Sequence, residues 1–234
     1  MTHVQITLWG VLPYLVLVLF VAGSAWRYRY DRFGLTTRSS QLHESRLLAV
    51  GAPMFHYGLL FVLAGHVVGL VVPEWLTLDL DVTEPLYRAN ALLVGGAAGL
   101  ATVGGLGILT ARRLRVRAVR VTTSRSDRVL YPILATVLLA GLTATLITPI
   151  TGHYDYREGV SLWFRSLFTL DPDVPAISRA PVVFQLHTLL GLALFALWPF
   201  SRLVHAFAAP VGYLARPYVV YRSRGSAPAR RETL

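Results

Sequence analysis

Cysteine and lysine are both missing from this chain of 234 residues, and acidic residues are few. Without cysteine the chain has no disulfide, no cysteine-ligated zinc and no cysteine-ligated iron–sulfur cluster of its own. Only 15% of the residues are charged, against about 25% in an ordinary soluble domain, and 54% are hydrophobic. A soluble protein of this size has too little interior to bury so much apolar surface. The composition therefore indicates an integral membrane protein.

Five apolar runs are long enough to cross a bilayer, which takes about 20 helical residues. They are Ile6–Trp26, Leu48–Val71, Asn90–Thr110, Val129–Ile150 and Val182–Val204. The first run has no basic region before it and is followed by arginines, which favours a retained span over a cleaved signal peptide. We therefore predict an all-α integral membrane bundle of five transmembrane helices.

All 22 basic residues are arginines, and most of them lie between the first and second spans, between the third and fourth spans, and after the fifth. A nucleic-acid-binding face would instead be a basic surface on a soluble module, with aromatic residues interleaved. The connections Pro73–Ala89 and Thr151–Pro181 hold most of the acidic residues. The positive-inside rule then places the N-terminus outside and the C-terminus in the cytoplasm of a multi-pass protein of the cell membrane. Residues 1–206 form the membrane domain, and 207–234 a cytoplasmic tail that docks a partner.

Four of the seven histidines lie in, or at the end of, the second and fifth spans. Ionisable groups at such depths are costly and are usually functional. Because the two spans run antiparallel, His66 pairs with His187 near the outer face, and His56 pairs with His205 near the cytoplasm. The helix rise separates the two levels by roughly 15 Å on the second span and roughly 27 Å on the fifth, a mismatch that requires tilted helices or ligands reaching along the axes. Eighteen residues are five whole turns, which puts His187 and His205 on one helix face.

Two stacked pairs of imidazoles suit haem iron, which takes two axial ligands from facing helices. Zinc would usually add cysteine or carboxylate ligands, or take four ligands at one level, and none stands near these histidines. Gly51, Gly58 and Gly65 recur every seven residues, and Gly191 follows His187 by one turn. These glycines give a macrocycle close access to the backbone; the alternative is ordinary small-residue packing between helices. The residues predict a membrane cytochrome with two haems b.

Several segments resemble the respiratory nitrate reductase gamma subunit family, and the resemblance covers nearly the whole chain. They are Arg27–Tyr30, Arg38–Gln41, Phe55–Gly69, Val116–Thr123, Phe184–His187, Pro199–His205 and Tyr213–Tyr218. The resemblance implies a membrane anchor that oxidises quinol, either menaquinol or ubiquinol. It implies that electrons pass through two haems b to an iron–sulfur beta subunit and then to a molybdenum-containing alpha subunit, which reduces nitrate in the cytoplasm. The family's four haem ligands fall on His56, His66, His187 and His205.

Four further residues are candidates for the same sites. In this family a basic residue outside the third span borders the quinol pocket; the nearest candidates here are Tyr87 and Arg88, and Arg88 is equally well explained as an interfacial anchor. Gly65 gives a quinol ring room beside His66. Arg202, three residues before His205, shares its face and is predicted to neutralise a propionate of the inner haem.

Two other functions compete with this one. The same kind of cytochrome serves other membrane complexes, such as sulfur-metabolism or heterodisulfide-type reductases, and the histidines alone do not separate these from nitrate reductase. A transporter or metal channel with a histidine pathway is a different class, but the broken helices and internal repeats common in transporters are not visible in the sequence.

Overall fold

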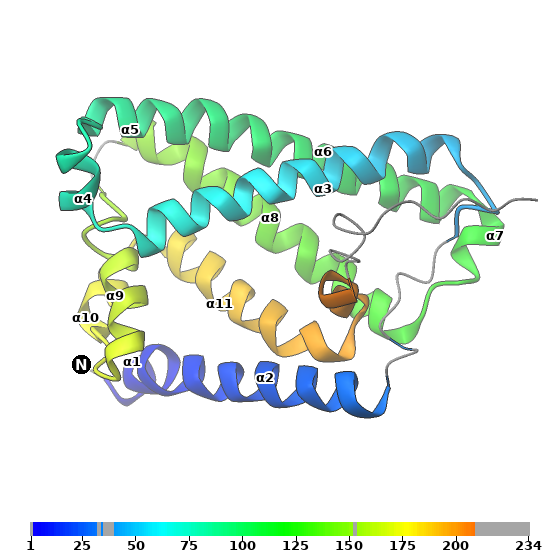
Figure 1. Ribbon diagram of the computed structural model, residues 1–234, viewed down its shortest axis with the longest axis horizontal. Helices are drawn as coiled ribbons and strands as arrows, with labels where there is room; N and C mark the ends of the chain where they lie inside the picture. Colours follow the sequence, from blue (N-terminus) through cyan, green and yellow to red (C-terminus); the bar gives the residue numbers. More distant parts are fainter. Residues whose placement is uncertain (1, 32–33, 35–39, 152–153, 209–234) are drawn as a thin grey trace, which may run out of the picture.

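The computed structural model describes residues 2–31, 34, 40–151 and 154–208, and the regular elements in that part of the chain are helical. Five of the helical segments are long and apolar enough to cross a membrane (Figure 1): His3–Tyr30, Arg46–Val71, Glu84–Arg115, Arg125–Ile147 and Val182–Phe200. Each overlaps one predicted span, so the five-span, all-α prediction is confirmed.

The five long segments are built from α-helices joined by short π- or 3-10 turns. In chain order they comprise α1 (His3–Ile6), η1 (Thr7–Val11), α2 (Leu12–Tyr30), α3 (Arg46–His66), η3 (Val67–Val71), α5 (Glu84–Asn90), η4 (Ala91–Gly95), α6 (Gly96–Arg115), α8 (Arg125–Thr151), α11 (Val182–Leu197) and η6 (Trp198–Phe200). Short elements connect them: α4 (Glu74–Asp79), α7 (Arg117–Arg120), α9 (Val160–Ser166), η5 (Leu167–Thr169) and α10 (Val174–Ser178). The short element η7 (Arg202–Ala208) follows the last of the long segments.

Helices α3 and α6 pack closely because glycine occupies their contact. A methyl group on Gly58 would lie 2.7 Å from the Thr102 hydroxyl, and one on Gly105 would lie 2.5 Å from the backbone of Phe55. Gly51 meets Ile108 of α6 in the same way, at 2.8 Å. Small residues allow this approach, which is the usual way in which membrane helices associate. For Gly51 and Gly58 the packing interpretation is therefore the correct one.

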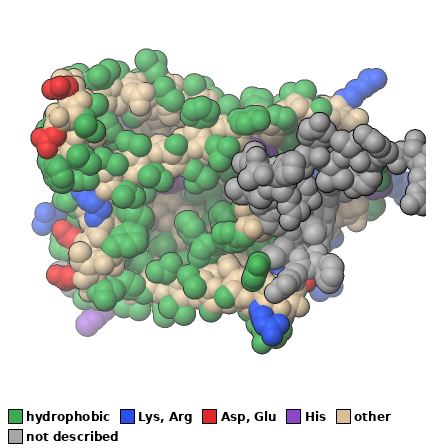
Figure 2. Space-filling view, viewed as in Figure 1, with side chains coloured by type: hydrophobic (Ala, Val, Ile, Leu, Met, Phe, Trp, Pro, Cys, Tyr) green, Lys and Arg blue, Asp and Glu red, His purple; other side chains and the backbone are tan. Residues whose placement is uncertain are grey.

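The two ends of the bundle differ in charge. Helices α4, α5, α9 and α10 lie at what we call the acidic end, where the carboxylates of Figure 2 gather. Its acidic residues are Glu74, Asp79, Asp81, Glu84, Asp155, Glu158, Asp171 and Asp173. At the opposite end, which we call the arginine-rich end, α2 and α6 terminate and α3 and α8 begin (Figure 1). The alternation of charge along the sequence thus becomes a separation of charge in space.

The fifth span ends earlier than predicted. Helix α11 stops at Leu197, the turn η6 contains Pro199, and Ser201 is extended (φ −121°, ψ 178°) before η7 begins. Proline removes a backbone donor and obstructs a continuing helix. His205 therefore lies in a separate 3-10 segment, and the prediction that it shares one continuous helix face with His187 is wrong. Within the predicted tail, residues 209–234 lie outside the described residues.

Candidate functional site

The four histidines of the predicted second and fifth spans form two facing pairs in the structure. The ring centroids of His66 and His187 are 5.8 Å apart, and those of His56 and His205 are 6.1 Å apart. The two pairs are those expected from antiparallel spans. The mismatch between roughly 15 Å and roughly 27 Å came from treating the fifth span as one helix. The chain leaves the helix at Ser201, before it reaches His205, so the rise of one continuous helix does not apply to the fifth span.

In each histidine the ring nitrogen Nδ1 lies within hydrogen-bonding distance of a backbone carbonyl. The acceptors are the oxygens of Ala52 for His56 (2.7 Å), Val62 for His66 (2.7 Å), Val137 for His187 (2.9 Å) and Arg202 for His205 (2.5 Å). A carbonyl oxygen only accepts, so Nδ1 must carry the proton. In a neutral imidazole this leaves Nε2 with a free lone pair, which is the state of a metal-ligating histidine.

The spacing of the rings also fits metal ligation. An imidazole nitrogen binds a first-row metal at about 2 Å, and the ring centre lies about 1 Å further away, so two rings on opposite sides of one ion have centres roughly 6 Å apart. The measured separations are 5.8 and 6.1 Å. Each pair is thus spaced to hold one metal ion between two imidazoles, the ligand set that haem iron takes in helical bundles.

Two glycines beside the histidines face open space. A methyl group added to Gly65 or to Gly191 would meet no heavy atom within 4 Å. Gly65 precedes His66, and Gly191 lies one helical turn after His187. These two members of the predicted set therefore differ from Gly51 and Gly58, because they do not serve the contact between α3 and α6. The backbone around the His66/His187 pair is accessible to a bulky planar group.

The structure adds a residue that sequence reasoning missed. Gly141 of α8 lies against the ring of His187, and a methyl group there would be 2.7 Å from the ring carbon Cε1. The absence of a side chain lets His187 reach the carbonyl of Val137, one turn earlier on α8. In the sequence, Gly141 is one small residue in an apolar span, and nothing there connects the fourth span with the histidines.

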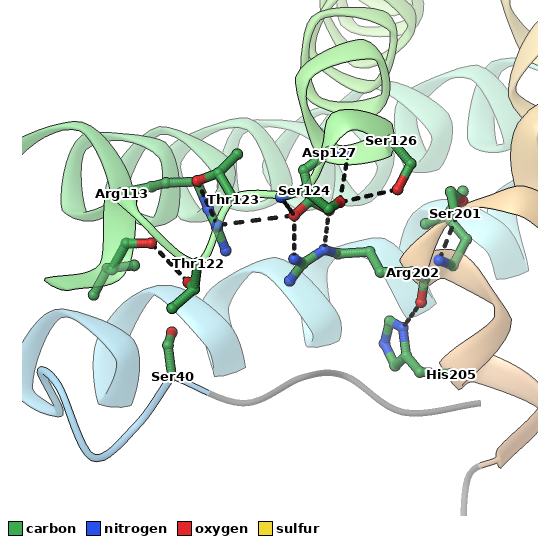
Figure 3. A network of polar contacts seen from close by, with 12 residues as sticks. Ser40, Arg113, Thr122, Thr123, Ser124, Ser126, Asp127, Ser201, Arg202 and His205 are labelled. Carbon is green, nitrogen blue, oxygen red and sulfur yellow. Dashed lines mark hydrogen bonds and ion pairs between the residues drawn. The ribbon is translucent and has the colours of Figure 1, made fainter. Parts of the chain in front are cut away.

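Arg202 forms a paired contact with an acidic residue that the sequence analysis did not single out. Its Nε and Nη2 donate to the two carboxylate oxygens of Asp127, both at 2.6 Å (Figure 3). Asp127 is only 1% exposed. Burial alone lowers the pKa of Arg202, but the bond to Asp127 and its charge outweigh this and raise the pKa, so the guanidinium stays charged. The propionate contact of Arg202 remains a prediction.

At the acidic end the two quinol-pocket candidates lie in different surroundings. Arg88 is exposed and binds Glu84 (2.6 Å) and Asp155 (2.9 Å), whereas Tyr87 is buried and its hydroxyl lies 2.6 Å from that of Tyr156. Burial, reinforced by the bond to Tyr87, raises the pKa of Tyr156 far above its ordinary value, so this hydroxyl stays protonated. A methyl group on Gly69, one turn after His66, would lie 3.0 Å from the same hydroxyl. The tyrosine pair thus adjoins the helix end that carries His66.

Comparison with known proteins identifies the family. The family model of the nitrate reductase gamma subunit matches residues 5–224. The chain belongs to the nitrate reductase gamma subunit family. It is 43% identical to the nitrate reductase gamma chain of Bacillus subtilis, over 93% of this chain and 97% of that one. It is 32% identical to the respiratory nitrate reductase 1 gamma chain of Escherichia coli, over 96% and 100% of the two chains.

A third relative is longer. The nitrate reductase-like protein NarX of Mycobacterium tuberculosis is 50% identical over 92% of this chain, but the chain spans only one third of NarX. Membership in the gamma subunit family confirms the resemblance drawn from the sequence. The matched region includes both histidine pairs, so the family assignment and the paired geometry concern the same part of the molecule.

Proposed function

We propose that this chain is the membrane-anchor cytochrome b subunit of a respiratory nitrate reductase, oxidising quinol near the outer face and delivering the electrons to the cytoplasmic side. The observation that carries the proposal is the two facing imidazole pairs, spaced for an iron between them, in a chain of the gamma subunit family. His66 and His187 hold one haem b, and His56 and His205 hold the other. Haem at these two levels supplies one-electron transfer between a membrane donor and an acceptor on the opposite side.

The charge distribution supports an orientation. Arginine-rich surfaces of membrane proteins face the cytoplasm, which supports an acidic end outside and a C-terminus inside. The His66/His187 pair then belongs to the outer level, because α3 runs from the arginine-rich end towards α4. The partners in this proposal are an iron–sulfur beta subunit and a molybdenum-containing alpha subunit, both reached from the arginine-rich end.

The surroundings of His66 suit a quinol. Gly65 leaves space beside the ring, and the paired hydroxyls of Tyr87 and Tyr156 lie near the same helix end. Only one of these two hydroxyl protons is used in their mutual bond, which leaves a donor for a quinol oxygen. Menaquinol and ubiquinol both present such oxygens. Glu84 and Asp155 lie at the acidic end, where released protons would leave the molecule.

Oxidation at the outer level separates charge across the membrane. The protons of the quinol stay outside while its electrons move to the cytoplasmic side. Each electron moved against a membrane potential of 100 mV stores about 2.3 kcal/mol. Oxidation at the His56/His205 level would release the protons in the cytoplasm, and no free energy would be stored as charge separation. The side on which protons are released therefore distinguishes the two sites.

Proteoliposomes that contain the assembled complex, oriented with the acidic end outward, provide the test. With quinol as donor and an artificial acceptor inside, we expect acidification of the external medium, measured with an external pH dye. A protonophore should abolish the lasting pH difference, which is the control for a true gradient. Acidification of the interior, or unchanged quinol oxidation after replacement of His66 with alanine, would contradict the outer site.

Arg88 offers a narrower test of the quinol pocket. Replacement of Arg88 with glutamine should raise the KM for quinol by about 10-fold or more, because a hydrogen bond from a charged donor contributes about 1.5–3 kcal/mol. Haem content should be unchanged, since an exposed ion pair contributes only about 0–1 kcal/mol to folding. Arg29→Gln, at the arginine-rich end, is the control. An unchanged KM in the Arg88 variant would leave this residue as an interfacial anchor.

A further inference from the structure

His205 differs from the other three histidines in the element that supplies the acceptor for its ring nitrogen Nδ1. The acceptors of His56 and His66 belong to α3, and that of His187 belongs to α8. The Nδ1 of His205 instead bonds the carbonyl of Arg202, inside the seven-residue 3-10 segment η7 that follows the break at Ser201. Hydrogen bonds in 3-10 segments have poorer geometry than those in α-helices. The position of His205 therefore depends on contacts that η7 makes with other elements.

Asp127 provides such a contact. Its carboxylate accepts two hydrogen bonds of 2.6 Å from the guanidinium of Arg202 (Figure 3). Two parallel charge-assisted bonds fix the orientation of an arginine as well as its distance. Asp127 is itself anchored to the start of α8, because Ser124 and Asp127 exchange bonds between their side chains and backbone amides, at 3.0 and 3.1 Å. This is the reciprocal pattern of a helix capping box.

The same turn of α8 holds Arg202 from a second side. Tyr131, one turn after Asp127, has the guanidinium carbon of Arg202 at 5.7 Å from its ring centre and that of Arg113 at 5.1 Å. Cations at these distances are attracted to the ring face. Arg113 also lies 3.9 Å from the Asp127 carboxylate. A carboxylate and an aromatic ring on α8 thus locate the residue whose carbonyl bonds His205.

We propose that Asp127 is the positioning residue for the inner haem, on the basis of the proposed function. By holding Arg202, it fixes the carbonyl that orients the imidazole of His205 towards His56. The positive charge of Arg202 is balanced by Asp127. Arg202 therefore acts through its backbone on His205, which is a different task from the propionate contact predicted from the sequence.

The test compares Asp127→Asn, Arg202→Gln and the double variant in the full chain, purified with its natural partner subunits. Haem per chain, the midpoint potentials of the two haems and their low-spin electron paramagnetic resonance signals are measured. We expect both single variants to retain the inner haem about 10–100-fold less tightly, as is found when the group that orients a metal ligand is removed. The double variant should retain the inner haem no less tightly than the weaker of the two single variants, because all three variants remove the same interaction. The outer haem should remain, which shows that the chain has folded.

Two results would contradict the positioning role of Asp127. If Arg202 bound a propionate directly, Asp127→Asn would leave the charge of Arg202 unbalanced. The inner haem would then stay, and its midpoint potential would rise. Arg202→Gln would still lose the inner haem. That result overturns the positioning role. Loss of both haems in Asp127→Asn also overturns a role confined to the inner site.

Glu44→Gln is the matched control. It breaks the ion pair between Glu44 and Arg112, whose atoms are 2.6 Å apart and which lies at the same end of the bundle. The arginine of that pair is 3% exposed, so the two pairs are comparably buried. Both haems should stay; loss of the inner haem here would show general loosening of this end and overturn the proposal. An unmodified chain without haem would instead refute the proposed function.

Discussion

Replacing His66 or His187 with alanine should abolish the same haem, and replacing His56 or His205 should abolish the other. Each ring pair is spaced for one iron, at 5.8 and 6.1 Å between centroids, so the loss of either partner leaves a single axial ligand. We expect the haem content of each variant to fall from two per chain to one, measured by reduced-minus-oxidised absorbance and pyridine haemochrome. Potentiometric titration then identifies which haem remains.

The control for this series is His43→Ala, which replaces a histidine in an exposed loop at the arginine-rich end. Both haems should persist in it. The assignment of pairs is wrong if His56→Ala and His187→Ala lose the same haem while the other stays. The same series also separates the proposed cytochrome from a histidine-lined transporter, because a transporter shows no haem bands in any of these variants or in the unmodified chain.

Gly141→Ala should have nearly as large an effect, although it adds only one methyl group. That methyl would lie 2.7 Å from Cε1 and 3.2 Å from Nδ1 of His187, and the imidazole is a rigid ring rather than the end of a flexible chain. Overpacking of this kind costs about 1–3 kcal/mol. The ring escapes by moving away from α8, which breaks its bond to Val137. We expect the outer haem to be retained about 10–100-fold less tightly, while retention of the inner haem is unchanged.

Gly107→Ala is the matched control, because a methyl group there meets nothing within 4 Å. The substitution also sits in a long apolar helix and changes helix propensity by the same amount. It should leave both haems in place. Equal haem contents in Gly141→Ala and Gly107→Ala would show that α8 does not set the position of His187.

The spans and the pairing could be predicted because they depend on properties that the sequence states directly. Length and hydropathy locate a span, and the parity of crossings decides which ends of two helices meet, so His66 could be matched with His187 without a structure. The break at Ser201 could not be predicted in this way. It depends on whether Pro199 ends the helix or the apolar sequence continues it, and hydropathy does not decide between the two.

The remaining omissions concern residues that act across helices. Gly141 matters only because α8 lies against α11, and Asp127 only because η7 folds back onto the start of α8. A glycine in an apolar span and a lone acidic residue among arginines look ordinary in the sequence. Their roles arise from tertiary contacts, which local patterns of hydrophobicity and charge do not encode.

Three of the four paired histidines belong to long helices, and the fourth to a short segment beyond the break at Ser201. The order of assembly follows from this difference. Association of the membrane helices alone brings His66 and His187 together, so the outer site is complete once the bundle has formed. In the proposed cytochrome, the inner site would stay open on one side until η7 docks on α8, which would give haem a route of entry from the arginine-rich end after insertion. By the same reasoning, the inner site is the first to open when that end of the bundle is loosened by detergent or heat.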